Sequence, residues 1–431
     1  MGPIYQIEHD SMTFVQATLA KQAAGPLAST TAEQRNNALA AMAQALRNEA
    51  DAIIGANARD MEAARAKGTA AGLLDRLLLD RERIESIASA LEELVGLPDP
   101  LGEVVDGRVI AGGVQLTTVR VPLGVVAIVY EARPNVTADA AGLCLKTGNA
   151  CILRGGSLAS NTNYAMGTVL ARAAEGAGLP EHCLQVMADE SHEAVEQLMG
   201  LTGLIDLLIP RGGKGLIRSC VANSKVPVIQ TGEGNCHLYL HEKAAPEKAL
   251  KILVNAKCQR VGVCNAIETL LIDDSAADEL LPACLAALAE HQVTMHCDEH
   301  ALRIARQQGT AGCVPADPEG ADWETEYLAP EIAIKCVSGV DEAISHINRY
   351  GTGHSEAIVS EDYTACERFL AGVDAAAVYA NASTRLTDGG VFGLGAEVGI
   401  STQKLHARGP MGLRALTTTK SLLRGTGQVR A

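Results

Sequence analysis

Residues 255–273 read Asn-Ala-Lys-Cys-Gln-Arg-Val-Gly-Val-Cys-Asn-Ala-Ile-Glu-Thr-Leu-Leu-Ile-Asp and form the junction around which the chain is organised. The pattern predicts a helix that ends near Lys257 and includes Cys258, then a short Arg-Gly loop and an apolar strand from Ala266. Cys264 lies between the two elements, where unpaired backbone N–H groups can polarise a thiol. We therefore predict that Cys264 is a nucleophile, although local sequence alone favours a buried structural thiol.

Strand and helix patterns alternate on both sides of this junction. Apolar runs of strand length, separated by helical runs, indicate parallel sheets covered on both faces. Two consecutive series in a chain of 431 residues predict two domains with a boundary near residue 255. The expected strands are 125–130, 150–153, 184–187, 204–209, 226–230 and 238–241 in the first series, and 268–273, 293–297, 331–337, 356–360 and 375–379 in the second.

Two further regions flank these series. Residues 13–95 have helical periodicity, with an N-cap signal at Ser29-Thr30-Thr31 and a C-cap signal at Gly68, and we expect a helical layer on a sheet. Residues 114–121 alternate as a half-exposed strand does, and the Thr-rich segment 413–424 is also strand-like. Because segment 413–424 has no local partner, we expect it to pair with residues 114–121 of another subunit in a homo-oligomer.

The composition argues against several classes of protein. A net charge of −15 argues against nucleic-acid binding, because phosphate neutralisation needs concentrated Lys and Arg. No apolar run reaches the roughly 18 residues of a membrane span, and residues 1–13 lack the pattern of a secretory signal. The 12 cysteines are scattered singly without a CxxC pair, which is typical of reduced thiols and favours a cytoplasmic enzyme.

Two strand–helix junctions could face the phosphate or ribose groups of a ligand. Leu153-Arg154-Gly155-Gly156-Ser157 offers a cation and backbone amides, and Pro210-Arg211-Gly212-Gly213-Lys214-Gly215 opens a helix whose N-terminus attracts anions. Neither a Walker A motif nor a G-x-G-x-x-G fingerprint occurs, since Gly215 follows Lys214 and Gly232-x-Gly234 lacks a third glycine. Two ordinary glycine-rich loops are the alternative.

A polar turn follows the first strand of the first series, in residues 130–137. Asn135 comes after Pro134, and its amide N–H₂ could donate to an oxyanion. The alternative is a turn asparagine that bonds its own backbone. We expect no metal, because the spacings of Cys236, His237, Cys258 and Cys264 match no zinc pattern.

Six motifs occur in order along nearly the whole chain. They are Tyr-Glu-Ala-Arg-Pro-Asn (130–135), Leu-Arg-Gly-Gly-Ser (153–157), Ile-Pro-Arg-Gly-Gly-Lys-Gly-Leu-Ile (209–217), Gly-Glu-Gly-Asn-Cys-His (232–237), Asn-Ala-Lys-Cys-Gln-Arg-Val-Gly-Val-Cys-Asn-Ala (255–266) and Gly-Pro-Met-Gly-Leu-Arg-Ala-Leu-Thr (409–417). With them the sequence resembles the γ-glutamyl phosphate reductases, also called glutamate-5-semialdehyde dehydrogenases, of the aldehyde dehydrogenase superfamily.

The resemblance implies an α/β, aldehyde dehydrogenase-like fold with two parallel-sheet α/β domains and a small β oligomerisation flap. It implies NADPH-dependent reduction of L-glutamate 5-phosphate to L-glutamate 5-semialdehyde and phosphate through a cysteine thioester, in the second step of L-proline synthesis. The implied parts are an NADP-binding domain (1–105 and 125–254), a catalytic domain (255–405) and oligomerisation strands (106–124 and 406–431).

The resemblance also assigns roles to single residues. Cys264 would be the nucleophile, and Asn135 with the backbone N–H of Cys264 would hold the oxyanion. The guanidinium of Arg154 suits an adenosine 2′-phosphate, which favours NADP(H), and Glu326 would hold the nicotinamide ribose. The other implied cofactor-binding residues are Gly155, Gly156, Ser157, Arg211, Gly212, Gly213 and Lys214. The candidate substrate-binding residues are Arg133, Arg260, Asn381, Ser383, Thr384 and Arg385.

Departures from the resemblance bear on the reaction. Thr231 stands where hydrolytic members of the superfamily have a glutamate that activates water, which favours a thioester that accepts hydride. Cys258 and Val261 stand where the family is expected to have Thr and Pro. The alternatives are a hydrolytic NAD(P)-dependent dehydrogenase of another semialdehyde and an inactive scaffold. Length argues against a fused kinase, so functional coupling to glutamate 5-kinase would involve a separate protein, and we expect a dimer or tetramer.

Overall fold

A computed structural model describes residues 11–131, 133–189 and 191–430 as two compact units. Unit 1 contains the chain up to Thr231, Gly393–Gly399 and the segment from Met411 onward, and unit 2 contains Gly232–Phe392 and Ile400–Pro410. The division thus falls earlier than the expected boundary near residue 255. The reason is strand pairing, because β7 (Cys236–Leu240) lies between β8 (Ile267–Asp273) and β12 (Ser355–Val359) in the second sheet.

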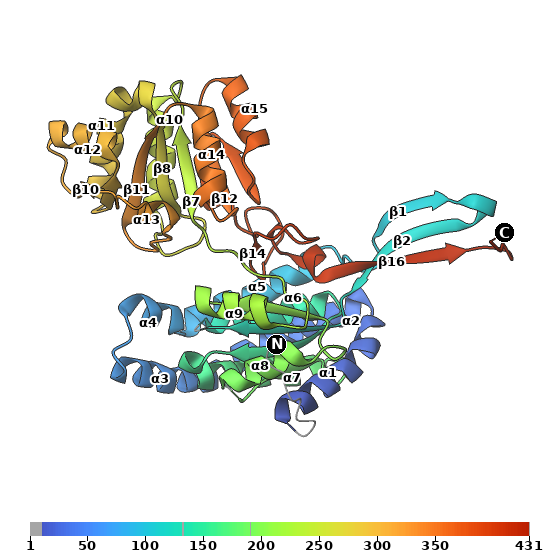
Figure 1. The fold of residues 1–431 in the computed structure, drawn as a ribbon. Coiled ribbons are helices and arrows are strands. Elements are labelled where there is room, and N and C mark those ends of the chain that lie inside the picture. Colours follow the sequence, from blue (N-terminus) through green and yellow to red (C-terminus); the bar gives the residue numbers. More distant parts are fainter. Residues whose placement is uncertain (1–10, 132, 190, 431) are drawn as a thin grey trace. The chain divides into compact units, whose positions relative to one another are not determined.

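Unit 1 is built on a four-stranded parallel sheet of order β5-β4-β3-β6. Helices α1, α6 and α7 pack against its strands (Figure 1). Residues 226–230 form no strand there, only a bridge from Val228 to Leu208, because Pro227 has no N–H to donate to a ladder. The bounds are β3 (Val125–Tyr130), β4 (Ala150–Gly155), β5 (Leu184–Val186), β6 (Leu207–Arg211), α6 (Pro134–Lys146), η2 (Ser157–Ala159), α7 (Ser160–Gly176), α8 (His192–Gly200) and α9 (Lys214–Asn223).

In the described part of the chain before this sheet, helices fill most of the region 13–95 that the periodicity predicted to be helical. Thr31 and Gln34 form a capping box, in which Thr31 Oγ1 accepts from the backbone N–H of Gln34 and Gln34 Oε1 accepts from that of Thr31. Gly68 follows α3 with a φ of 70°, which only glycine adopts without steric cost. The bounds are α1 (Met12–Ala28), α2 (Ala32–Asn48), α3 (Ala50–Ala66), α4 (Ala71–Leu77) and α5 (Arg81–Gly96).

A three-stranded antiparallel sheet joins β1 (Val104–Val109), β2 (Gln115–Pro122) and β16 (Thr417–Arg424), with η1 (Ala111–Gly113) between β1 and β2 and η4 (Leu413–Leu416) before β16 (Figure 1). The strand β16 pairs along its whole length with β2 of its own chain. The expectation that it pairs with another subunit is therefore wrong. Pairing within one chain avoids the translational and rotational entropy cost of association.

Unit 2 contains a seven-stranded parallel sheet of order β10-β9-β11-β8-β7-β12-β13. Alternate residues of each strand point to opposite faces. Leu238 and Leu270 pack with α10, α11 and α12, whereas Tyr239 and Leu271 pack with α14 and α15 (Figure 1). The sheet is therefore buried on both faces, as predicted.

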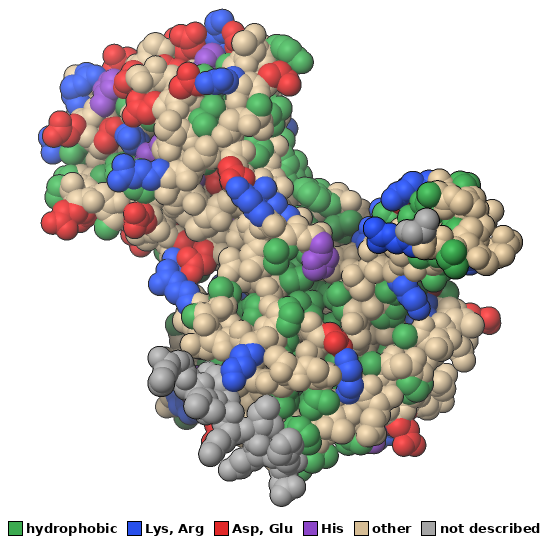
Figure 2. Space-filling view, turned by 45° about the vertical axis from the view of Figure 1, so that its right-hand side comes forward, with side chains coloured by type: hydrophobic (Ala, Val, Ile, Leu, Met, Phe, Trp, Pro, Cys, Tyr) green, Lys and Arg blue, Asp and Glu red, His purple; other side chains and the backbone are tan. Residues whose placement is uncertain are grey.

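The remaining elements of unit 2 are α10 (Pro246–Cys258), α11 (Asp274–Glu290), β9 (Thr294–Cys297), α12 (Glu299–Gln308), β10 (Cys313–Pro315), α13 (Ala321–Glu324), β11 (Glu331–Val337), α14 (Val340–Tyr350), α15 (Tyr363–Gly372), β13 (Ala377–Ala380), η3 (Thr384–Leu386), β14 (Ile400–Ser401) and β15 (Gly409–Pro410). On the face in Figure 2, acidic and basic side chains are interspersed over this unit. Of the helices in the described ranges, none combines the length and apolarity needed to cross a bilayer.

A group of aromatic and imidazole rings packs around His346 of α14, and His346 and His237 are the buried members. The imidazole of His346 lies 5.6 Å from that of His237, 5.7 Å from Trp323 and 4.7 Å from Tyr350, measured between ring centroids. Burial lowers the pKa of His346 to about 3, and the nearby His237 contributes to the shift. Neither ring nitrogen of His346 has a hydrogen-bond partner among the described residues.

Replacing His346 by phenylalanine is expected to make the protein less sensitive to acid. Between about pH 3 and 6.5 the unfolded state binds a proton at His346 that the folded state does not, so stability falls as the pH decreases. Without this group, the loss of unfolding free energy from about pH 7 to about pH 5 should shrink by about 2 kcal/mol. Urea unfolding at both pH values measures this loss of unfolding free energy. An equal loss in His346→Phe and the exposed-site control His291→Phe would contradict the assignment.

Candidate active site

The predicted nucleophile lies where the sequence suggested, in the turn between α10 and β8. Cys264 is partly exposed. The neighbouring Cys258 is the last residue of α10 and lines a hollow of about 550 Å³ together with Val254 and Asn255. Burial raises the pKa of the Cys258 thiol, and the positive charge of Lys257 opposes that shift. A raised pKa reduces the thiolate fraction of Cys258, which argues against Cys258 as the nucleophile.

The segment before β7 holds the backbone of Cys264 in place. Gly234 lies so close that a Cβ added to it would be 1.5 Å from the carbonyl oxygen of Cys264. The thiol of Cys236 donates to the same carbonyl, with Sγ 3.1 Å from the oxygen. Glu326 Oε1 accepts from the backbone N–H of Gly234 at 2.7 Å. Glu326 is therefore joined to the nucleophile through one glycine.

Replacing Gly234 by alanine should displace Cys264, because the atoms that the methyl group would meet are backbone atoms. A shift of about 1 Å in a reacting group typically costs about 10²-fold in rate, so kcat should fall by about that factor. Steady-state kinetics measures this, and Gly55→Ala in α3, with open space at its Cβ position, is the matched control for the substitution itself. Unchanged kcat in Gly234→Ala would exclude a role of this contact in placing the thiol.

Cationic and amide side chains flank the thiol. The Arg385 guanidinium donates to the side-chain oxygens of Asn265 and of Gln259, the latter at 2.8 Å. Burial lowers the pKa of Arg385, and the positive charge of the exposed Arg260 lowers it further. The Cys264 thiol opposes this shift, so Arg385 and the sulfur interact electrostatically. Arg385 thus places positive charge beside the predicted nucleophile, and Arg260 lies close to Arg385.

The other predicted substrate residues of this unit are placed differently. Thr384 is buried and its hydroxyl donates to the carbonyl of Asn265 at 2.7 Å, so it supports the residue next to Cys264. Ser383 caps η3 by accepting from the backbone N–H of Arg385. The side-chain amide of Asn381 makes two hydrogen bonds to the backbone of Ser360. Its Oδ1 accepts from the N–H of Ser360 at 3.1 Å, and its Nδ2 donates to the carbonyl of Ser360 at 2.8 Å. The structure joins Thr384, Ser383 and Arg385 to the Cys264 region, and gives Asn381 a structural contact at the carboxyl end of β12.

A fully buried ion pair joins the two elements on either side of the loop that carries Cys264. Lys257 Nζ lies 2.5 Å from Glu268 Oε2, and neither side chain is exposed. Glu268 also accepts from the backbone N–H of Leu328 at 3.2 Å. Burial raises the pKa of the Glu268 carboxyl and lowers that of Lys257, and each charge opposes the shift of the other. The pair ties the end of α10 to the start of β8.

The two predicted cofactor junctions are in unit 1. Arg154, at the end of β4, is buried and donates to the carbonyl of Ser191 at 3.1 Å. Gly155 is the last residue of β4, and Gly156 and Ser157 lead into η2. Gly155 packs against Asn163, since an added Cβ would lie 2.1 Å from its side-chain nitrogen. Gly155 is thus required for packing.

The second junction carries an anionic group at a helix end. Arg211 closes β6, and Gly212 and Gly213 precede α9, whose first residue is the exposed Lys214. The carboxylate of Glu131 accepts from the backbone N–H of Gly213 at 2.9 Å and lies over Gly212, where an added Cβ would meet it at 2.6 Å. The start of α9 therefore accommodates an anionic oxygen, which is the chemistry that a phosphate needs.

Asn135 and Arg133 lie at the start of α6 in unit 1, and both are exposed. Asn135 donates from Nδ2 to Asp139 Oδ2 at 3.0 Å, a side-chain contact in place of the backbone contact that was its alternative. Burial raises the pKa of Asp139 to about 6, opposed by this hydrogen bond and by the charge of Arg211. Thr231 is buried and donates to the carbonyl of Pro210 at 3.0 Å. A hydroxyl in that position supplies no carboxylate base.

Residue-by-residue interpretation of the sequence missed several contacts around Cys264. Gly234 and Cys236 contact the backbone carbonyl of Cys264. Gln259 and Asn265 accept hydrogen bonds from the guanidinium of Arg385. All four lie within the quoted motifs at 232–237 and 255–266, so the motif boundaries were the available signal. Periodicity could not single them out, because their roles depend on β7 lying beside β8.

Comparisons with known proteins show which family the chain resembles over nearly its whole length. The Aldehyde dehydrogenase family model matches residues 8–304 and 315–422. The chain is 53% identical over 411 residues to the gamma-glutamyl phosphate reductase of Moorella thermoacetica, covering 95% of this chain and 97% of that protein. It is 51% identical over 411 residues to that of Bifidobacterium adolescentis, covering 95% and 96%.

A solved structure indicates the same family. The crystal structure of gamma-glutamyl phosphate reductase from Thermotoga maritima matches with a TM-score of 0.94 at 43% identity, over 98% of this chain and 100% of that chain. The aldehyde dehydrogenase-like fold and the resemblance noted from the six motifs are thereby confirmed. The chain belongs to the aldehyde dehydrogenase family of oxidoreductases, and within it to the gamma-glutamyl phosphate reductases.

Proposed function

We propose that this protein reduces L-glutamate 5-phosphate to L-glutamate 5-semialdehyde and phosphate with NADPH, as the second step of L-proline synthesis. The observation that carries the proposal is a partly exposed thiol, Cys264, that interacts with the guanidinium of Arg385, to which Arg260 is also close, in a chain 53% identical to a gamma-glutamyl phosphate reductase. An acyl phosphate carrying a carboxylate is an anionic substrate, and arginine forks suit both groups.

The proposed reaction begins when the Cys264 thiolate attacks the acyl carbonyl. The oxyanion accepts hydrogen bonds from the backbone N–H of Cys264 and from Asn135, in roles that the resemblance assigns. Breaking the C–O bond releases phosphate and leaves a thioester on Cys264. NADPH would supply the hydride for the carbonyl carbon. The hemithioacetal then breaks its C–S bond, which releases the aldehyde and restores the thiolate.

The residues of both junctions suit a nucleotide with phosphates. Arg154 and Arg211 supply cations, Gly155, Gly156 and Ser157 follow Arg154, and the start of α9 at Gly213 and Lys214 already holds the carboxylate of Glu131. A pyrophosphate bound there would take over this N–H, with Glu131 moving aside. Glu326, which accepts from Gly234 beside the nucleophile, is the candidate ligand of the nicotinamide ribose.

The reverse reaction tests the proposal. With the semialdehyde and NADP⁺, NADPH formation should require inorganic phosphate or arsenate. One of these anions must accept the acyl group from the thioester, because Thr231 supplies no base that could activate water. Parallel assays with NAD⁺ measure the cofactor preference. Turnover without phosphate or arsenate would favour the hydrolytic dehydrogenase instead, and no turnover under either condition would favour an inactive scaffold.

Three further predictions belong to this proposal. We expect a homodimer or homotetramer, coupling to glutamate 5-kinase and a cytoplasmic location. Acyl phosphates are reactive toward water, so an enzyme that consumes one gains from proximity to the enzyme that makes it. Size-exclusion chromatography with light scattering measures the subunit number.

A further inference from the structure

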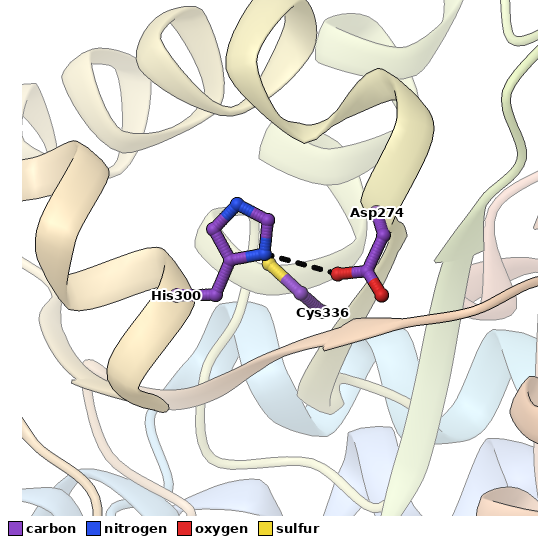
Figure 3. Close-up of side chains that lie close together, drawn as sticks. All are labelled: Asp274, His300 and Cys336. Carbon is purple, nitrogen blue, oxygen red and sulfur yellow. Dashed lines mark hydrogen bonds and ion pairs between the residues drawn. The ribbon is translucent and has the colours of Figure 1, made fainter.

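We propose that Asp274, His300 and Cys336 form a binding site for a divalent zinc-type cation at the carboxyl edge of the sheet in unit 2. One ligand atom from each residue lies within 4.8 Å of the other two. Among the described residues, these are the only three His, Cys, Asp or Glu side chains grouped this closely. Figure 3 shows the imidazole of His300 facing the carboxylate of Asp274, with the sulfur of Cys336 beside the same ring nitrogen.

Strand order explains why three distant residues meet. The strands β9, β11 and β8 are neighbours and parallel. Asp274 follows the last residue of β8, His300 is the second residue of the helix after β9, and Cys336 is the next-to-last residue of β11. Carboxyl ends of adjacent parallel strands meet at one edge, which is where open α/β sheets commonly bind ligands.

Hydrogen bonds hold the three side chains in this arrangement. His300 Nδ1 lies 3.0 Å from Asp274 Oδ1. Asp298 accepts from the backbone N–H of Cys336 at 2.8 Å and also caps α12, on which His300 lies. One carboxylate thus fixes the strand that carries the thiol and the helix that carries the imidazole. Supporting contacts of this kind orient metal ligands.

The charge around the sulfur favours a cation. The Cys336 side chain is buried, and the carboxylates of Asp298, Asp274 and Asp278 lie close enough to interact with its sulfur. Arg303 also interacts with the sulfur, but its guanidinium is shared with Asp278, 3.5 Å away. A bound divalent cation would supply the missing positive charge and stabilise the thiolate.

The ligand types indicate which cation fits. Calcium and magnesium take oxygen ligands, whereas a thiolate, an imidazole and a carboxylate together suit zinc. Three protein ligands leave a fourth tetrahedral position for water or an added ligand. The side chains of His300 and Asp274 are 30% and 48% exposed, so an ion can reach them from solvent. The site is therefore expected to exchange its metal.

This site is separate from the nucleophile. Cys264 precedes β8 and Asp274 follows it, and β8 has seven residues. A strand rises about 3.3 Å per residue, so the two positions are about 20 Å apart. The proposed cation site and the Cys264 thiol therefore lie at opposite ends of β8.

Cobalt(II) is the probe for the test, because a thiolate bound to it gives a charge-transfer absorption band. The full chain with Cys264→Ser, which removes the predicted nucleophile as a competing thiol, is titrated with Co²⁺ and then with Zn²⁺. We expect the band to appear with one Co²⁺ per chain and to be displaced by Zn²⁺. In this background, Cys336→Ser should abolish the band, and His300→Ala and Asp274→Asn should weaken Co²⁺ binding at least about tenfold, as for supporting or direct ligands.

Cys258→Ser and His291→Ala are the matched controls, since they remove a half-buried thiol and an exposed imidazole elsewhere in unit 2. Both should leave the band unchanged. Because His300 and Asp274 are partly exposed, their variants remain informative if Cys336→Ser folds poorly. A missing band in the parent, or a band of full affinity in His300→Ala and Asp274→Asn, would overturn the proposal.

Discussion

Replacing Cys264 by serine should lower kcat by more than about 10³-fold, in both the reduction of the acyl phosphate and the oxidation of the semialdehyde. The hydroxyl of serine is far less acidic than a thiol, so it forms far less of the anionic nucleophile near neutral pH. The groups that flank Cys264 are the guanidinium of Arg385, the carbonyl contact to Cys236 and the backbone of Gly234. KM should change little, because the arginines remain.

Cys258→Ser is the control, and it should keep most of the activity because the raised pKa of the Cys258 thiol lowers its thiolate fraction. Mass spectrometry of the protein mixed with substrate without NADPH gives a second measurement. An acyl adduct is expected on the peptide that carries Cys264 and should be missing from Cys264→Ser. Full activity in Cys264→Ser together with loss in Cys258→Ser would transfer the nucleophile to the helix.

Replacing Lys257 by methionine should destabilise the protein by about 3–5 kcal/mol, because it leaves the carboxylate of Glu268 buried without its partner. Methionine retains most of the volume of lysine, so the lost charge dominates. Without Lys257, the pKa of Glu268 rises further above its value in the unfolded chain. A raised folded-state pKa means that stability is lost as the pH increases through the window above about 4.3.

The deficit of Lys257→Met should therefore be larger at about pH 8 than at about pH 6, as measured by urea unfolding followed with circular dichroism. The double variant Lys257→Met/Glu268→Leu should recover most of the loss, since a buried pair is often replaceable by apolar residues. The surface pair of Lys243 and Asp362 is the matched control, and Lys243→Met should have little effect. A Lys257→Met deficit that does not depend on pH would mean that packing, not charge, causes it.

The two predictions differ in what they test. Loss of activity in Cys264→Ser with wild-type stability identifies a chemical role. Loss of stability in Lys257→Met, even with residual kcat per folded molecule, identifies the pair as the support of the loop between α10 and β8. The pair and the nucleophile are close in sequence, so both measurements are needed on each variant.

The sequence alone predicted the elements that depend on local patterns. The strand at 125–130 and the strand at 331–337 have the predicted bounds, because unbroken or alternating apolar runs bounded by turn residues signal a strand directly. The Thr31 cap is equally local, since its partners lie within three residues. The position of Cys264 between a helix and a strand was predicted for the same reason, as it lies at a change of period, and the six motifs then indicated the family.

Tertiary structure decided everything that depends on strand order. Residues 236–240 belong to the second sheet because they pair with 267–273, and 417–424 pairs with 115–122 across nearly three hundred residues of chain. The same order brings Gly234 against Cys264 and gathers Asp274, His300 and Cys336 at one edge. Local sequence specifies which faces of a segment are apolar, but many partners can cover an apolar face. The choice among them is made by the packing of the whole sheet, which no single stretch of sequence contains.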